Sequence, residues 1–327
     1  MSGPHVLLAC LFFGELAGAL YEPFGAAARA FSARAALART RAAGGAYATE
    51  ILQLRLVQGG SPMIIGIDLG ASAVKLAALE GDEIVLTHYE HGRGADVPAL
   101  CERLGLDLRS AEAVAVSGLS ARRAGLEALG ITPVNVPEAE AIGRGATWLS
   151  GRDDIIVASI GTGTAFVHAK GGQFTHLCGT GVGAGTLTGL AERVLGITDM
   201  REFDRMAMAG NTNHVDLTIG DFVEMHGILA ADLTASNLAR RNAEATDSDW
   251  AAGLATLIFQ VIGTMSLLAC RGCGAKSVVV TGAIADTAPS RANFARFVDG
   301  YGLDYFVPEH SACATAIGTA RCVRSAE

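Results

Sequence analysis

The fold prediction starts from the stretch Met63-Ile-Ile-Gly-Ile-Asp68-Leu-Gly70-Ala-Ser72-Ala-Val-Lys75. It predicts a buried strand that ends at Asp68, and apolar runs over 74–79 and 84–89 complete a three-strand meander. A carboxylate at a strand end can hold Mg²⁺, directly or through water. The tight turn at Gly70 and the Ser72 hydroxyl can approach a phosphate, to which Lys75 adds a positive charge. An ordinary hairpin explains the same residues, so this motif alone leaves both interpretations open.

A second polar, glycine-rich loop opens the second half of the chain, at Ser159-Ile-Gly161-Thr162-Gly163-Thr164. It follows a predicted buried strand over 154–160 and precedes a strand that runs through Val167. Its glycines permit close approach of the backbone to an anion, and its hydroxyls donate hydrogen bonds without a fixed charge. Gly-Thr alternation also occurs in plain hairpins. Two such loops, one at the start of each half, predict a nucleotide bound between two domains.

The rest of the chain predicts a duplicated α/β fold preceded by an extension. We expect residues 1–62 to be disordered or to precede the true start at Met63, with domains at 63–152 and 153–327. The extension lacks the basic flank of a secretory signal and the unbroken apolar run of a membrane span, while its arginines leave a transit peptide open. Further strands are predicted over 113–117, 175–178 and 277–282, and helices over 97–104, 121–129, 139–149, 250–270 and 311–323, with another that ends near 195.

Three further stretches supply candidate site residues. Glu138 lies just inside a predicted helix, where a carboxylate can act as a general base, although by itself it suits an ordinary helix start better. Gly282 ends a predicted strand, where adenosine commonly lies in two-domain ATPases; a plain strand-to-helix turn is the alternative. The glycines over 179–185 precede a helix, and such helix starts bind anions. Their match to a dinucleotide-binding pattern is weak, and the chain contains no GxxxxGK[ST] sequence.

Composition favours a soluble globular enzyme. The formal net charge of −8 and the pI near 5.5 argue against a nucleic-acid partner. Seven cysteines, odd in number and scattered, argue against a disulfide framework and for a reducing compartment, so we expect a cytoplasmic protein without membrane contact. Cys270 and Cys273 form a lone CxxC pair, which we interpret as two buried, inert thiols.

Taken in order, the two phosphate loops and the adenosine loop resemble the actin-like ATPase superfamily. More narrowly, the chain is similar to the type II pantothenate kinases from Met63 almost to its C-terminus. The similarity rests on the glycine loops over 161–164 and 179–190, on Gly196-Ile-Thr-Asp199, and on the stretches 211–217, 232–237 and 311–318. The Ile-Thr-Asp and Asp-Leu-Thr-Ala-Ser-Asn sequences are its distinctive parts. The resemblance implies two ribonuclease H-like domains with a nucleotide cleft between them.

The resemblance also implies a reaction and roles for residues. ATP would phosphorylate the primary hydroxyl of pantothenate to give 4'-phosphopantothenate, the first step of coenzyme A synthesis, and Glu138 falls where the family keeps its catalytic base. Asp68 would hold Mg²⁺, and His176, Gly179, Thr180 and Gly181 would bind the acyl substrate. ATP would contact Asp68, Gly70, Ser72, Lys75, Ser159, Gly161, Thr162, Gly163, Thr164 and Gly282. The family is dimeric, which implies a homodimer formed through the helix at 250–270.

Two positions depart from the family pattern. The first loop usually contains Asp-x-Gly-Gly-Thr, whereas this chain has Ala71-Ser72 at its end and keeps the hydroxyl. The family usually places an arginine ahead of the third glycine cluster, and here that position is His176, which is shorter and only partly charged at neutral pH. A different acceptor, pantetheine-like or sugar-like, therefore stays open. So does a catalytically silent nucleotide-binding regulator.

Overall fold

The computed structural model describes residues 62–92, 96–118, 124–222 and 233–324 of the 327-residue chain. The expectation for residues 1–62 falls almost entirely outside this description. Every element that builds the site belongs to one compact unit, residues 61–101 and 107–327. That unit contains two five-stranded sheets.

The first sheet has the strand order β3-β2-β1-β4-β5. Its strands are β1 (Met63–Leu69), β2 (Ala73–Glu80), β3 (Glu83–His91), β4 (Ala113–Ser117) and β5 (Val134–Asn135). The first three pair antiparallel as the predicted meander, whereas β4 lies parallel to β1 and β5 parallel to β4. All seven residues of β1 are buried, which explains its continuous apolar run.

The second sheet repeats this arrangement. Its strands are β6 (Ile155–Ile160), β7 (Thr164–Lys170), β8 (Gln173–Thr180), β11 (Ser277–Gly282) and β12 (Asp304–Phe306), in the order β12-β11-β6-β7-β8. β6, β7 and β8 form an antiparallel meander, while β11 lies parallel to β6 and β12 parallel to β11. Each sheet is therefore a meander followed by two parallel strands, and the predicted duplication is confirmed.

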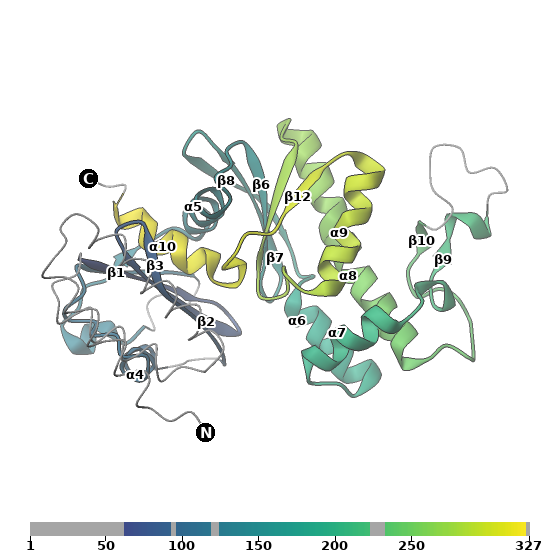
Figure 1. Ribbon diagram of the computed structural model, residues 1–327, viewed down its shortest axis with the longest axis horizontal. Helices are drawn as coiled ribbons and strands as arrows, with labels where there is room; N and C mark the ends of the chain where they lie inside the picture. Colours follow the sequence, from purple (N-terminus) through teal and green to yellow (C-terminus); the bar gives the residue numbers. More distant parts are fainter. Residues whose placement is uncertain (1–61, 93–95, 119–123, 223–232, 325–327) are drawn as a thin grey trace, which may run out of the picture. The chain divides into compact units, whose positions relative to one another are not determined.

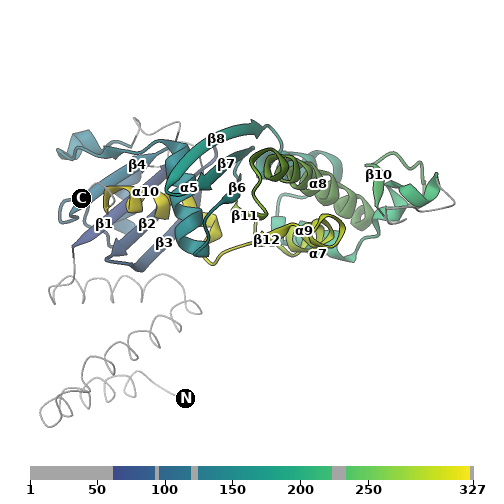
Figure 2. The ribbon, with the colours of Figure 1, turned by 90° about the horizontal axis from the view of Figure 1, so that it is seen from above.

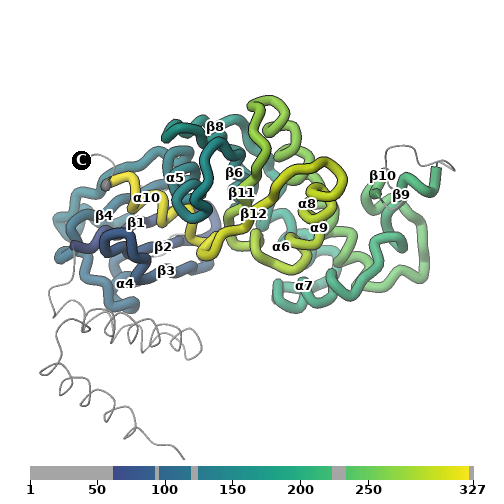
Figure 3. Tube along the Cα trace, turned by 45° about the horizontal axis from the view of Figure 1, so that its top comes forward, coloured from purple at the N-terminus to yellow at the C-terminus, as the bar shows by residue number. Residues whose placement is uncertain are grey.

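Two helices lie between the sheets (Figure 2). α10 (Ala314–Arg324) packs on β1, β2 and β4, and α5 (Glu138–Ser150) packs on β6, β7, β8 and β11. The two helices cross closely because glycines stand at the contact. A Cβ at Gly318 would lie 1.9 Å from the Ala141 carbonyl oxygen, and one at Gly145 would lie 2.0 Å from that of Ala314. Figure 3 shows α10, in yellow near the C-terminus, beside β1, the first strand of the first sheet.

The other face of the second sheet is covered by α8 (Asp247–Cys273), with α6 (Ala184–Leu190), α7 (Met200–Ala209) and α9 (Ala288–Tyr301) beside it (Figure 1). Ile156 and Phe166 from the sheet and Phe259 and Ile262 from α8 are fully buried in this core. By length and composition alone α8 could also cross a membrane, but most of its apolar stretch is buried inside the protein. Packing against the sheet therefore accounts for its composition.

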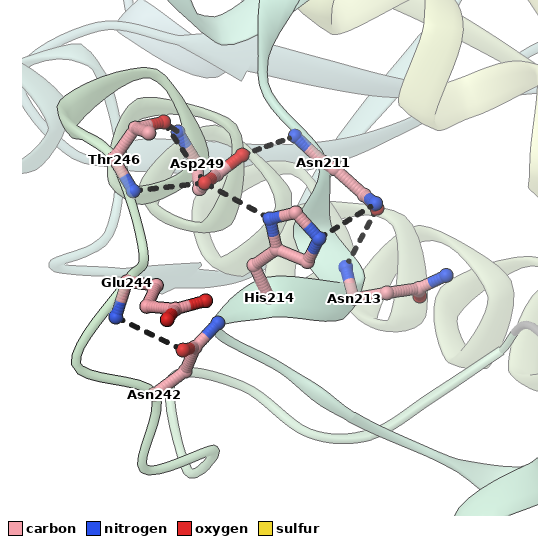
Figure 4. Close-up of polar contacts among 7 residues, drawn as sticks. All are labelled: Asn211, Asn213, His214, Asn242, Glu244, Thr246 and Asp249. Atoms are coloured by element: carbon pink, nitrogen blue, oxygen red, sulfur yellow. Dashed lines mark hydrogen bonds and ion pairs between the residues drawn. The ribbon is translucent and has the colours of Figure 1, made fainter.

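The start of α8 is fixed by a buried carboxylate (Figure 4). Thr246 and Asp249 form a capping box, and Asp249 also accepts hydrogen bonds from the Asn211 N–H at 2.7 Å and from His214 Nδ1 at 3.1 Å. These hydrogen bonds, led by that of Asn211, hold the pKa of Asp249 well below its usual range. The site thus ties the segment after α7 to the first turn of α8.

The shorter elements are α4 (Val97–Arg103), η2 (Leu126–Leu129), a π-helical turn η3 (Ala191–Leu195), η4 (Thr212–His214), η5 (Ile219–Asp221) and η6 (Ser311–Cys313), with the β9 (Leu217–Thr218) and β10 (Thr234–Ser236) pair.

Three predictions need correction. The helix predicted over 121–129 is only the 3₁₀ turn η2 within the described residues, because glycines in left-handed conformation, Gly125 at φ 72° and Gly130 at φ 73°, flank it. The C-terminal helix was assigned to the domain 153–327, but α10 packs on the first sheet. Cys270 is buried as predicted and burial raises its pKa to about 11, whereas Cys273 at the end of α8 is only half-buried.

Candidate functional site

A cleft of about 540 Å³ is lined by residues of both sheets. The two predicted phosphate loops meet in it, where Ser72 Oγ and Thr162 Oγ1 lie 2.9 Å apart. The cleft brings together all but one of the predicted site residues: Asp68, Gly70, Ser72, Lys75, Glu138, Ser159, Gly161, Thr162, Gly163, Thr164, Gly179, Thr180, Gly181 and Gly282. His176 is the exception. It lies exposed on β8 and does not line the cleft.

The first loop presents a buried ion pair to the cleft. Asp68 near the end of β1 is directly opposite Lys75 on β2, and their side chains form an ion pair at 2.9 Å. Asp68 is only 5% exposed, so its charge needs this partner. Burial alone lowers the pKa of Lys75, but the charge and hydrogen bond of Asp68 outweigh it and the pKa is raised. Lys75 therefore keeps its positive charge beside the loop.

The second loop is tied to the start of α6 by its backbone. The Ala184 N–H donates to the Gly161 carbonyl at 2.8 Å and the Gly185 N–H to that of Thr162 at 3.1 Å. A Cβ at Gly183 would lie 2.5 Å from the Gly163 carbonyl oxygen, so only glycine allows this approach. A Cβ at Gly181 would meet nothing within 4 Å. The loop is thus packed on one side and open on the other, as a phosphate cradle requires.

The Glu138 carboxyl lines the cleft from the first turn of α5, directly after Pro137. The side chain is open to solvent on the cleft side, while the surrounding protein partly desolvates it. That desolvation, together with the charge of Asp68, raises the pKa of Glu138, against the opposing effects of Lys75 and His176. A raised pKa makes a carboxylate a better proton acceptor near neutral pH. His176 acts on this group through its charge although it lies outside the cleft lining.

Gly282 lines the cleft at the end of β11, next to Ala283. Its φ is 110°, and a Cβ added here would lie 2.0 Å from the Ile160 carbonyl oxygen, so both the conformation and the space exclude a side chain. The end of β11 therefore packs tightly against the end of β6, and no side chain projects at this point of the cleft lining.

Several cleft residues escaped the sequence analysis. Tyr89 and His91 come from β3, and others include Gly118, Thr188, Ser311, Ala312 and Thr315. Strand register was the available signal for the β3 pair. Lys75 is directly opposite Tyr89, and directly opposite residues of an antiparallel pair share a face. The N-terminal end of α10 carried no local signal, because its position depends on packing against the first sheet.

The site has one feature in favour of Mg²⁺. In the part of the chain that the structure describes, no cluster of three His, Cys, Asp or Glu side chains could hold a metal by itself. Mg²⁺ bound with a nucleotide, however, commonly uses one or two carboxylates plus phosphate oxygens and water. Asp68, with the charge of Glu138 nearby, supplies such a donor set. The residues present therefore fit a Mg²⁺–nucleotide complex.

Comparison with known proteins shows what the chain is similar to. The Fumble family model matches residues 154–301. A type II pantothenate kinase of Oceanobacillus iheyensis is 27% identical over 71% of this chain and 89% of its own length. The chain is therefore similar to the type II pantothenate kinases, as its sequence motifs predicted.

Solved structures show the same fold. Component A of the (R)-2-hydroxyglutaryl-CoA dehydratase of Acidaminococcus fermentans matches with a TM-score of 0.61 at 19% identity, over 82% of this chain and all of that one. The activator of the 2-hydroxyisocaproyl-CoA dehydratase of Clostridium difficile, solved with bound ADPNP, matches with a TM-score of 0.58 at 17% identity, over 81% and 98% of the two chains. These matches confirm the actin-like ATPase fold predicted from the sequence.

Proposed function

We propose that this protein uses ATP to phosphorylate the primary hydroxyl of pantothenate, which gives 4'-phosphopantothenate, the first intermediate of coenzyme A synthesis. One observation carries the proposal: the two glycine loops meet in a cleft that Glu138 also lines. The similarity to the Oceanobacillus kinase supports pantothenate as the acceptor. The ADPNP complex of a protein with the same fold supports ATP as the donor.

Each residue has a part that its position suggests. The second loop offers backbone N–H groups and hydroxyls to the phosphates, and Lys75 offers a positive charge next to them. Asp68 would hold Mg²⁺, which supplies positive charge to the phosphates when bound. Glu138 would orient the acceptor hydroxyl and take its proton, and its raised pKa suits that role. Catalysis of this kind is chiefly positioning and charge stabilisation.

His176 favours a second acceptor. The family's arginine is absent at this position, and the histidine that replaces it lies outside the cleft lining. An acceptor without a carboxylate, such as pantetheine or another small hydroxyl compound, would not need that cation. A nucleotide-binding regulator without turnover is the remaining alternative, and the presence of Asp68, Glu138 and both loops argues against it.

A homodimer formed through α8 and a cytoplasmic location belong to the same proposal. The outward face of α8 supports the dimer, because Leu268 is 60% exposed and Met265 is only half-buried beside it. An apolar stripe on a core helix gains stability when a second copy covers it. The free cysteines of the described residues suit a reducing compartment.

The test is an assay of ADP release with Mg-ATP and a panel of acceptors: pantothenate, pantetheine and simple sugars. Wild-type protein should release ADP with pantothenate, and Glu138→Gln protein should not. Turnover with pantetheine or a sugar but not with pantothenate would contradict pantothenate as the acceptor and favour a kinase that acts on the other compound. If the wild type binds ATP but shows no acceptor-dependent turnover above the Glu138→Gln control, the result would favour the nucleotide-binding regulator without turnover.

A further inference from the structure

The cleft contains a histidine that the mechanism above does not use. His91 is the last residue of β3 and stands directly opposite Ala73, beside the first phosphate loop. The next residue, Gly92, donates its N–H to the Ser72 carbonyl at 3.0 Å. Ser72 in turn meets Thr162 of the second loop at 2.9 Å. The backbone therefore anchors His91 next to the point where the two loops converge.

The ring of His91 is held by an aromatic contact. Tyr89 lies edge-on to it, with the ring centroids 4.9 Å apart and the planes at 73°. Both residues line the cleft, whereas His88 and Glu90 pair with each other at 3.2 Å from the alternate positions of the strand. Among the residues that the structure describes, none forms a hydrogen bond or ion pair with the imidazole ring of His91. Its ring nitrogens are therefore available to a ligand.

The charge balance of the cleft indicates what that ligand is. Asp68 and Glu138 bring two negative charges to the described lining and Lys75 one positive charge, which Asp68 already pairs. His91 is the remaining lining residue that can carry a positive charge. A nucleoside triphosphate brings several negative charges to the same loops, so a hydrogen-bond donor that can also be cationic is favoured there.

We propose that His91 binds the outer phosphates of the nucleotide through a ring N–H, with Tyr89 as the positioning residue. The inference rests on the proposed function only in that the cleft holds ATP. The nucleoside is expected at Gly282, which belongs to the second sheet. The phosphates that reach β3 of the first sheet are therefore the ones farthest from the nucleoside.

The experiment measures equilibrium binding of ATP, ADP and AMP, with Mg²⁺ and without acceptor, for wild type and variants. His91→Gln should weaken ATP binding roughly tenfold, the usual cost of losing a hydrogen bond to a charged group, and leave AMP binding unchanged. His91→Arg should restore ATP affinity. His88→Gln is the matched control, because it removes a histidine from the opposite face of the same strand, and it should bind like wild type.

The ratio of ATP to AMP affinity is the decisive readout, since it does not depend on the fraction of folded protein. Tyr89→Phe should keep the wild-type ratio and Tyr89→Ala should lower it. An unchanged ratio in His91→Gln would overturn the proposal, and so would equal weakening of ATP and AMP. The binding assay contains no acceptor, so its result is independent of the ADP-release assay. If the wild type binds ATP in the first assay but does not turn over pantothenate in the second, the proposed function is contradicted and the proposal for His91 is not. Failure of wild type to bind ATP would overturn both.

Discussion

Replacement of Gly183 by alanine should damage the phosphate cradle without straining the backbone. Gly183 precedes α6 with φ −173°, an extended conformation that any residue adopts. The added Cβ would instead lie 2.5 Å from the Gly163 carbonyl oxygen, 2.6 Å from its carbon and 2.8 Å from the Gly161 carbonyl oxygen. All three atoms belong to the backbone of the second loop, so no side chain can swing away to relieve the contact.

The size of the effect follows from these separations. Normal contacts between non-bonded carbon atoms are about 3.5–4.0 Å, so the loop has to move by roughly 1 Å. Overpacking of this kind costs about 1–3 kcal/mol of unfolding free energy. Misplacement of a catalytic geometry by about 1 Å can lower the rate roughly 100-fold. Gly183→Ala should therefore lower kcat/KM for ATP roughly 10- to 100-fold while the protein still folds.

The assay compares Gly183→Ala with Gly189→Ala in thermal unfolding and in steady-state kinetics. Gly189 lies in α6, the helix that Gly183 precedes, and a Cβ there would meet nothing within 4 Å. That control should keep wild-type kinetics and gain up to about 1 kcal/mol from helix propensity. Wild-type kcat/KM in Gly183→Ala would refute the reasoning, because the second loop would then tolerate displacement and would not be the phosphate cradle.

Four further predictions concern catalysis, packing and pH. Glu138→Gln should lower kcat about 10²- to 10⁴-fold without loss of ATP binding in calorimetry. Because the pKa of Glu138 is raised, wild-type activity should fall on acidification at a higher pH than an ordinary glutamate would give. A pH–rate profile that falls only at the pKa of an ordinary glutamate would contradict this prediction. Gly318→Ala should cost about 3 kcal/mol or more in chemical denaturation, since its Cβ would lie 1.9 Å from the Ala141 carbonyl oxygen. Gly300→Ala in α9, whose Cβ would meet nothing within 4 Å, should not destabilise the protein. Asp249→Ala should cost about 1–2 kcal/mol through loss of the cap. Folding lowers the pKa of Asp249, so the wild type should exceed Asp249→Ala in unfolding free energy above the ordinary pKa of about 3.9. This difference in unfolding free energy should vanish as the pH falls through the lowered pKa. A difference that stays constant down to about pH 2 would contradict the prediction.

The strands at the centre of each sheet were predictable because burial on both faces demands continuous apolar runs. β4 and β11 have the predicted limits, and β1 and β6 differ by one residue at an end. The positions of the two glycine-containing turns after β1 and β6 were predictable for a related reason. Each turn directly follows one of these buried strands, and glycine and small hydroxyl residues are typical of such turns.

Other features depend on contacts that the local sequence does not encode. Glu138 begins α5, as the neighbouring residues predict. It also lines the cleft, and that position depends on how α5 packs in the fold. The roles of Tyr89 and His91 need the register of β3 on β2. The return of α10 to the first sheet depends on the close approach at Gly318. The length of η2 was set by glycine conformations that a helical apolar pattern does not reveal.

Identification of the phosphorylated product tests the central claim most directly. Wild-type protein is incubated with Mg-ATP and an equimolar mixture of pantothenate and pantetheine, and the products are resolved by mass spectrometry and by ³¹P NMR coupled to the adjacent CH₂ protons. The account predicts a phosphate ester on the primary hydroxyl of pantothenate, absent in the Glu138→Gln control. Phosphorylation of pantetheine alone, or the same ester formed by the control, would contradict it.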